Sequence, residues 1–347
     1  MTRFKPVGMV ILLLIGSFAL IRAQDTTSIK DDAFWRMITD FSEEGGSFRY
    51  ENLLSNEMSY QTVIPSLKLV ARGGAYIGVG PEQNFTYIAA IEPKIAFIVD
   101  IRRQNMLLHL MYKALFEMSS DRTEFLSSLF SRPRPPLLTD EASTVDLFKA
   151  YSSETCDRRL LGETVQAVTD RLMTQHRFDL TEDDRKAVQH ILEAFCTAGP
   201  QIDYGFVNPP SNLTAPSYAD LMTATDNRGR SWSYLANAEN FDRIRKMESN
   251  NLIVPLVGNF AGRKAIRAVG QYLKQHDLME SAFYVSNVEQ YLNEAQKIAF
   301  RLNVEKLPAN NSSRIIRFIP PESTRLIPFS LLLMEPHSLF HLLSKQF

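Results

Sequence analysis

Several short apolar runs in this 347-residue sequence are followed at once by glycine or by polar side chains. The residues in question are Gly78, Gly80 and Glu82, then Asp100, then Asn259, and then Asn287 and Glu289. In an open parallel sheet, ligands bind beyond the carboxyl ends of the strands. We therefore expect these residues to gather at one sheet edge and to bind a small molecule there.

The turn that carries Gly78 and Gly80 is the first candidate for ligand contact. Glycine lets the backbone bend tightly and approach a ligand, and the helix start that follows offers free N–H groups. Asp100 lies 22 residues after Gly78, near the spacing at which an acid accepts a ribose hydroxyl. The alternatives are a tight strand-to-helix connection without a ligand, and a helix N-cap at Asp100.

Two residues after a later apolar run are candidates for catalysis. A buried Glu289 would act as a general base, with Asn287 beside it. The alternative is a helix start in which Asn287 caps and Glu289 complements the helix dipole.

The surrounding pattern predicts the elements that position these residues. Strands are expected over 74–80, 95–101, 252–258, 282–286, 314–320 and 326–334, and helices over 82–91, 103–118, 237–249 and 262–276. Strands and helices that alternate in this way form parallel βαβ units. The expected fold is therefore α/β, a Rossmann-like, mostly parallel sheet with helices on both faces.

Helical patterns without strands interrupt this alternation, which predicts an all-helical insertion over 119–200. Within it, Thr181 and Asp184 are spaced as a capping box. The Rossmann-like domain is then split into an N-terminal part, 24–118, and a C-terminal part, 201–347.

The glycine turn and the acid after the second strand resemble the Rossmann-like S-adenosylmethionine-dependent methyltransferases, over about 70–118 and more loosely 237–300. The resemblance implies that Gly78 and Gly80 hold the methionine part of S-adenosylmethionine and that Asp100 binds its ribose. The SNVEQYL segment resembles an uncharacterised exported bacterial branch, which brings no known reaction. The family's third glycine falls on Glu82, whose carboxylate would repel a pyrophosphate at the helix start and so disfavours NAD and FAD.

Residues 1–23 read as an export signal. Arg3 and Lys5 precede a 15-residue apolar run, Val7 to Ile21, and Ala23 is the expected cleavage residue. The run is short for a membrane span, although an uncleaved anchor and a buried helix are alternatives. Without this segment the chain has a formal charge of −4. In an oxidising compartment Cys156 and Cys196 would form a disulfide; otherwise they are two buried thiols.

Composition narrows the choice of function. With 38 basic and 39 acidic residues, the chain lacks the excess of positive charge typical of nucleic-acid binding. We expect no membrane contact after signal removal, and a small-molecule ligand as the partner. Two hypotheses follow: a methyltransferase-like enzyme, or a non-catalytic exported binding or structural protein on the same fold. Export favours the second, because S-adenosylmethionine is made in the cytosol.

Overall fold

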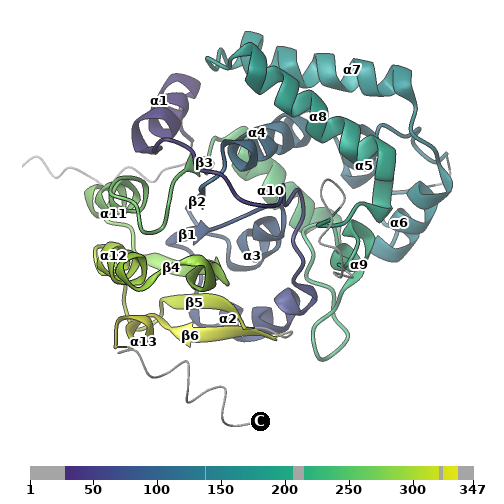
Figure 1. Ribbon diagram of the computed structural model, residues 1–347. Helices are drawn as coiled ribbons and strands as arrows, with labels where there is room; N and C mark the ends of the chain where they lie inside the picture. The colour runs from purple at the N-terminus through teal and green to yellow at the C-terminus, as the bar shows by residue number, and fades with distance from the viewer. Residues whose placement is uncertain (1–27, 137, 206–214, 320–322, 335–347) are drawn as a thin grey trace, which may run out of the picture.

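The computed structural model describes residues 28–136, 138–205, 215–319 and 323–334 (Figure 1). The predicted export signal, residues 1–23, lies outside the described residues. None of the helices in the described ranges is long and apolar enough to cross a membrane.

A six-stranded sheet runs through the centre of the described chain, in the order β3-β2-β1-β4-β5-β6. Its strands are β1 (Ala75–Gly78), β2 (Ile95–Asp100), β3 (Ile253–Val257), β4 (Glu280–Ser286), β5 (Arg314–Ile319) and β6 (Ser323–Pro328). The first five are parallel and β6 is antiparallel to β5. The expected α/β, Rossmann-like fold is confirmed.

The sequence explains both the centre and the edges of this sheet. Strands β1, β2 and β3 are buried along their whole length, as continuous apolar runs predict. Pro255 is tolerated because β3 is an edge strand, where a missing N–H costs no ladder hydrogen bond.

The predicted strand over 326–334 is wrong beyond Pro328. Helix α13 (Phe329–Met334) follows directly. Pro328 pairs with Arg314, which is the first residue of β5, so the chain has no strand partner past that point. The Leu-rich run therefore turns into a helix.

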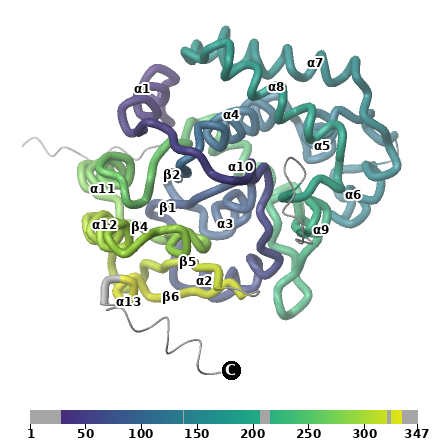
Figure 2. The backbone as a smooth tube through the Cα atoms, viewed as in Figure 1, coloured from purple at the N-terminus to yellow at the C-terminus, as the bar shows by residue number. Residues whose placement is uncertain are grey.

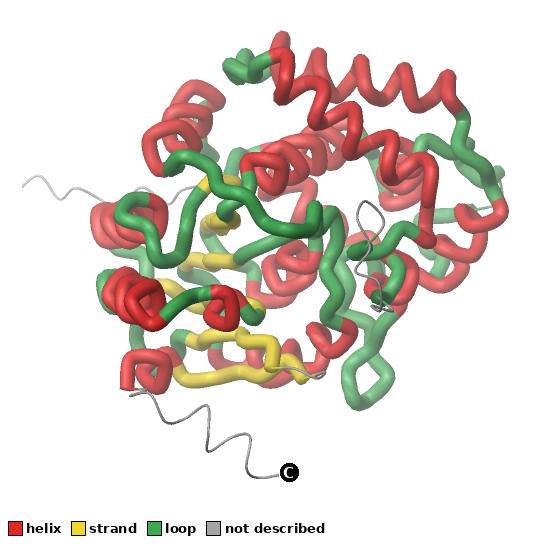
Figure 3. Tube along the Cα trace, viewed as in Figure 1, coloured by secondary structure: helices red, strands yellow, loops and turns green. Residues whose placement is uncertain are grey.

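Helices cover both faces of the sheet, as Figure 3 shows with the strands in yellow between two groups of red helices. One group contains α2 (Ile64–Val70), α3 (Gln83–Ile91), α4 (Arg103–Met118) and α10 (Ala238–Ser249). The other contains α1 (Asp31–Phe41), α11 (Ala265–Gln275), α12 (Glu294–Val304) and α13.

Within its described residues, the regular structure of the segment between α4 and α10 is helical, including a 3₁₀ helix over Gly199–Gln201, apart from one isolated bridge. It comprises α5 (Arg122–Phe130), α6 (Thr144–Ser153), α7 (Arg158–Thr169), a π-helical turn (Asp170–Gln175), α8 (Glu182–Ala198) and α9 (Tyr218–Thr223). The Thr181 hydroxyl accepts from the N–H of Asp184 at 3.1 Å, and the Asp184 carboxylate accepts from the N–H of Thr181 at 2.9 Å. The predicted capping box is therefore present at the start of α8.

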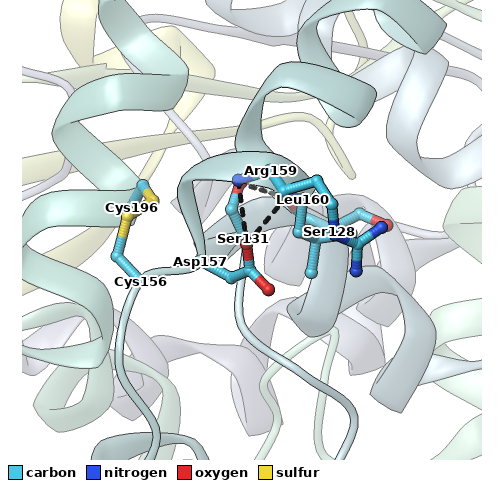
Figure 4. Close-up of a disulfide and its surroundings, with 7 residues drawn as sticks. All are labelled: Ser128, Ser131, Cys156, Asp157, Arg159, Leu160 and Cys196. Atoms are coloured by element: carbon cyan, nitrogen blue, oxygen red, sulfur yellow. Dashed lines mark hydrogen bonds between the residues drawn. A yellow bond between two sulfur atoms is a disulfide. The ribbon is translucent and has the colours of Figure 1, made fainter.

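A disulfide joins Cys156, in the loop between α6 and α7, to Cys196 in α8 (Figure 4). Their Cα atoms are 5.1 Å apart. Beside it, the N–H of Asp157 donates to the carbonyl of Ser131 at 2.8 Å, and the Asp157 carboxylate caps α7 by accepting from the N–H of Arg159. The loop is therefore fixed covalently and by hydrogen bonds, which decides between the two readings of the cysteines.

Candidate functional site

A cavity of about 760 Å³ lies at the carboxyl edge of the parallel strands. Its walls include the ends of four strands and the turns after them, namely 79–81, 99–102, 258–260, Tyr284 and 286–288. In the strand order, β1 lies between β2 and β4. The chain passes from β1 to β2 on one side and from β4 to β5 on the other, so the strand order reverses between β1 and β4. Such a switch point is where open α/β sheets bind ligands.

The structure brings together four of the seven predicted site residues. Gly80, Asp100, Asn259 and Asn287 line the cavity. Gly78, Glu82 and Glu289 are not among the lining residues.

Gly78 keeps the turn after β1 compact. A Cβ at this position would overlap with Oδ1 of Asn84, which accepts a hydrogen bond from the Tyr76 hydroxyl at 2.7 Å. The Asn84 amide donates to the carbonyls of Val79 (3.0 Å) and Pro81 (2.7 Å), so it fills the inside of the turn. A ligand therefore meets only the outer side of this turn.

Position 80 favours glycine for a different reason, because the φ of Gly80, +78°, lies in the left-handed region. The ring of His109, on α4, places Nε2 2.9 Å from the Gly80 carbonyl. Burial lowers the pKa of His109 to about 4, so the ring is neutral. Since a carbonyl only accepts, Nε2 carries the proton and holds the turn in place.

The structure contradicts the argument that the negative charge of Glu82 would repel a pyrophosphate. It is fully buried, and burial raises its pKa to about 8. A neutral carboxyl does not repel a pyrophosphate, and a side chain outside the cavity does not contact a ligand bound there. Glu82 therefore neither disfavours NAD and FAD through its charge nor lines the cavity.

Asp100 lines the cavity but already has a partner. Arg102 donates to its carboxylate through Nε (2.9 Å) and through Nη2 (2.8 Å), and both side chains are buried. The backbone N–H of Arg102 adds a third bond at 2.9 Å. Two of these bonds reach Oδ1 and one reaches Oδ2, which leaves Oδ2 able to accept one more donor.

The remaining predicted site residues, Asn259, Asn287 and Glu289, have different surroundings. Oδ1 of Asn259 accepts from the N–H of Ala261 at 2.9 Å, which shapes the loop after β3. Asn287 precedes a 3₁₀ helix over Val288–Tyr291 without capping it through its side chain. Glu289 forms an ion pair with the buried Arg317 of β5 at 2.6 Å. Its position in that pair, outside the cavity, favours a structural role.

The most informative group in the cavity, Glu57, was missed by the sequence reasoning. Its Oε1 accepts hydrogen bonds from the hydroxyls of Tyr284, at 2.8 Å, and of Ser286. Burial raises its pKa to about 7, although these bonds and the nearby Gln83 amide oppose the shift. Glu57 therefore changes protonation state near neutral pH. The only sequence signal was an unusually polar stretch between two helices.

That stretch, residues 42–57, forms a strap across the strand ends. Figure 2 shows it running in purple from α1 across the carboxyl edge towards α2. The N–H of Glu43 donates to the carbonyl of Val257 at 2.8 Å, and the N–H of Gly46 donates to that of Ile101 at 2.8 Å. Arg102 also donates to the Glu51 carbonyl. The strap thus closes one side of the cavity and places Glu57 in the cavity wall.

Aromatic rings from three separate segments meet at the strap side of the cavity. Phe48 lies 5.1 Å from Tyr291, and Tyr50 lies 5.7 Å from Tyr204, measured between ring centroids. The guanidinium of Arg49 lies 4.9 Å from the Tyr50 ring. The cavity therefore combines an acidic group at β4 with an aromatic wall.

The fold and this cavity define an α/β protein with a ligand-sized site at its topological switch point. A family model described as Domain of unknown function (DUF7790) matches residues 53–345, and the chain belongs to this family. The match includes Glu57 and all seven residues selected from the sequence. No curated protein matches the chain.

Proposed function

We propose that the chain binds a nucleoside-type small molecule in this cavity, with S-adenosylmethionine as the candidate ligand. The observation that carries the proposal is the cavity itself. Its volume of about 760 Å³ lies within the range of about 300–1,000 Å³ typical of small-molecule sites, and it sits at the switch point.

The residues in the walls suit such a ligand. Gly80 brings the backbone of the turn close to the cavity, and Asp100 has one acceptor position left for a hydroxyl. An ionised Glu57 attracts the positive charge of a sulfonium or an ammonium group, with little competition from water because it is buried. If methyl transfer follows, the protein's contribution is mainly to position donor and acceptor.

The ion pair between Asp100 and Arg102 favours a second candidate, a non-catalytic exported binding or structural protein. Both oxygens of Asp100 already accept hydrogen bonds, and Arg102 fastens the strap. In this candidate the carboxyl edge is a fixed scaffold rather than a site that opens for a cofactor.

Calorimetric titration with S-adenosylmethionine and S-adenosylhomocysteine separates the two. Binding of both, and little heat with NAD, is expected from the first proposal. Asp100→Asn keeps an oxygen for Arg102 but removes the charge, and should weaken binding by about 1–3 kcal/mol. Absence of heat and of any thermal shift at millimolar ligand refutes the proposed function and leaves the non-catalytic candidate.

A further inference from the structure

Ser286 ends β4 in a backbone conformation that serine rarely adopts. Its φ is +50°, in the left-handed region, and the pairing of β4 with β5 shifts register between Tyr284 and Ser286. Strain of this kind is retained at functional sites when the surrounding structure enforces it. The Ser286 side chain lines the cavity. It lies at the turn that joins β4 to the 3₁₀ helix over Val288–Tyr291. Nucleophilic serines of α/β enzymes occupy a similar strand-to-helix turn.

The Ser286 hydroxyl donates its hydrogen bond to Glu57. The same oxygen of Glu57 accepts from the Tyr284 hydroxyl at 2.8 Å, which fixes the carboxyl group relative to the serine. A nucleophile bonded to a base that a third group orients is the arrangement of activated serines. An ordinary carboxylate is a weak base, but burial brings the pKa of Glu57 to about 7, close to that of an imidazole.

We propose that Ser286 is a nucleophile toward carboxylic esters, with Glu57 as its general base and Tyr284 as the residue that positions the base. An ester suits the site better than a phosphate ester does. Of the two guanidinium groups that line the cavity, that of Arg102 is neutralised by Asp100 and that of Arg49 lies over the Tyr50 ring. The acidic group next to Ser286 is Glu57, so the reacting position favours an uncharged carbonyl group.

The reaction balances with these groups and water alone. Oγ of Ser286 bonds to the ester carbon while its proton passes to Glu57. The bond to the alcohol oxygen then breaks, and Glu57 returns the proton to that oxygen. A water molecule attacks the acyl-serine, Glu57 takes its proton and passes it to Oγ, and the carboxylic acid leaves.

The activity is independent of the proposed function, because it needs no nucleoside ligand. The test uses a fluorophosphonate, which reacts covalently with activated serines, on the full chain. Intact mass and peptide mapping should show one adduct, on Ser286. Ser286→Gly removes the hydroxyl and relieves the positive φ, so it should fold at least as well as the parent chain and take no label.

Two further variants test the roles of the neighbouring groups. Glu57→Gln should slow labelling of Ser286 at least 100-fold, the scale of general-base catalysis. Tyr284→Phe should retain labelling but move its pH dependence to higher pH, because the lost hydrogen bond favours the protonated carboxyl. Ser281→Ala is the control: this serine lies at the opposite end of β4, where it donates to the Gly73 carbonyl, and its loss should leave labelling unchanged.

An unlabelled Ser286, under conditions where a known serine hydrolase is fully labelled, overturns the nucleophile. Labelling that proceeds at the parent rate in Glu57→Gln overturns the base. Circular dichroism of each variant shows whether it is folded, and Ser286→Gly retains the test if other substitutions disturb β4.

Discussion

Removal of the Cys156–Cys196 disulfide should destabilise the folded chain by an amount set by the loop that it closes. The two cysteines are 40 residues apart in the sequence. A disulfide that closes a loop of this length lowers the chain entropy of the unfolded state and so stabilises the fold by about 4 kcal/mol at 25 °C. For a folded body of roughly 300 residues, removing this stabilisation lowers Tm by about 6 °C.

The assay is thermal and urea denaturation followed by circular dichroism, on the parent chain and on Cys156→Ala/Cys196→Ala. A thiol reductant provides the matched control. It should lower the midpoint of the parent chain to that of the double variant and leave the variant itself unchanged. A parent midpoint that is insensitive to reductant, after quantitative reduction is shown by mass, would refute the reasoning from loop length.

Two further predictions concern the turn after β1. Burial keeps a proton on Glu82 that the unfolded chain releases, so the free energy of unfolding should fall as pH rises from about 4.5 to about 8, the window between the ordinary and the raised pKa. Glu82→Gln should flatten this decline, which urea denaturation at pH 5 and pH 8.5 measures; an unchanged pH dependence would contradict it. Gly80→Ala should cost about 1 kcal/mol, because only its φ is unfavourable. Gly78→Ala should cost about 3 kcal/mol, because its Cβ meets Asn84. Equal losses of unfolding free energy would show that this contact relaxes.

The local sequence pattern was sufficient to predict much of the fold. Strands β1, β2 and β3 are continuous apolar runs because both of their faces are covered, and the polar residues that end them lie at one edge. The capping box at Thr181 is equally local. The last predicted strand is wrong because its end depends on where β5 begins, which the run itself does not encode.

The chemistry of the cavity depends on contacts between distant segments. Glu57 and Ser286 are 229 residues apart, and the polar strap around Glu57 has no periodicity that would single it out. The neutral state of Glu82 likewise follows only from burial by other parts of the chain. The partner of Asp100 is local, since Arg102 lies two residues away, but the sequence reasoning predicted a ribose contact or a helix N-cap for Asp100 and not this ion pair.

The contacts of the strap also determine when, during synthesis of the chain, the cavity can form. The N–H of Glu43 pairs with Val257, and Glu57 pairs with Ser286, so the strap is synthesised before its partners, which follow more than 200 residues later. Contacts of such long range form slowly, and chains with exposed partners are prone to aggregate before they form. The strap carries four acidic residues, Glu43, Glu44, Glu51 and Glu57, whose charges favour hydration of this segment before its partners are made. The cavity is therefore completed only after residues 284–296 have been synthesised, and nascent chains that end before β4 lack the contact between Glu57 and Ser286.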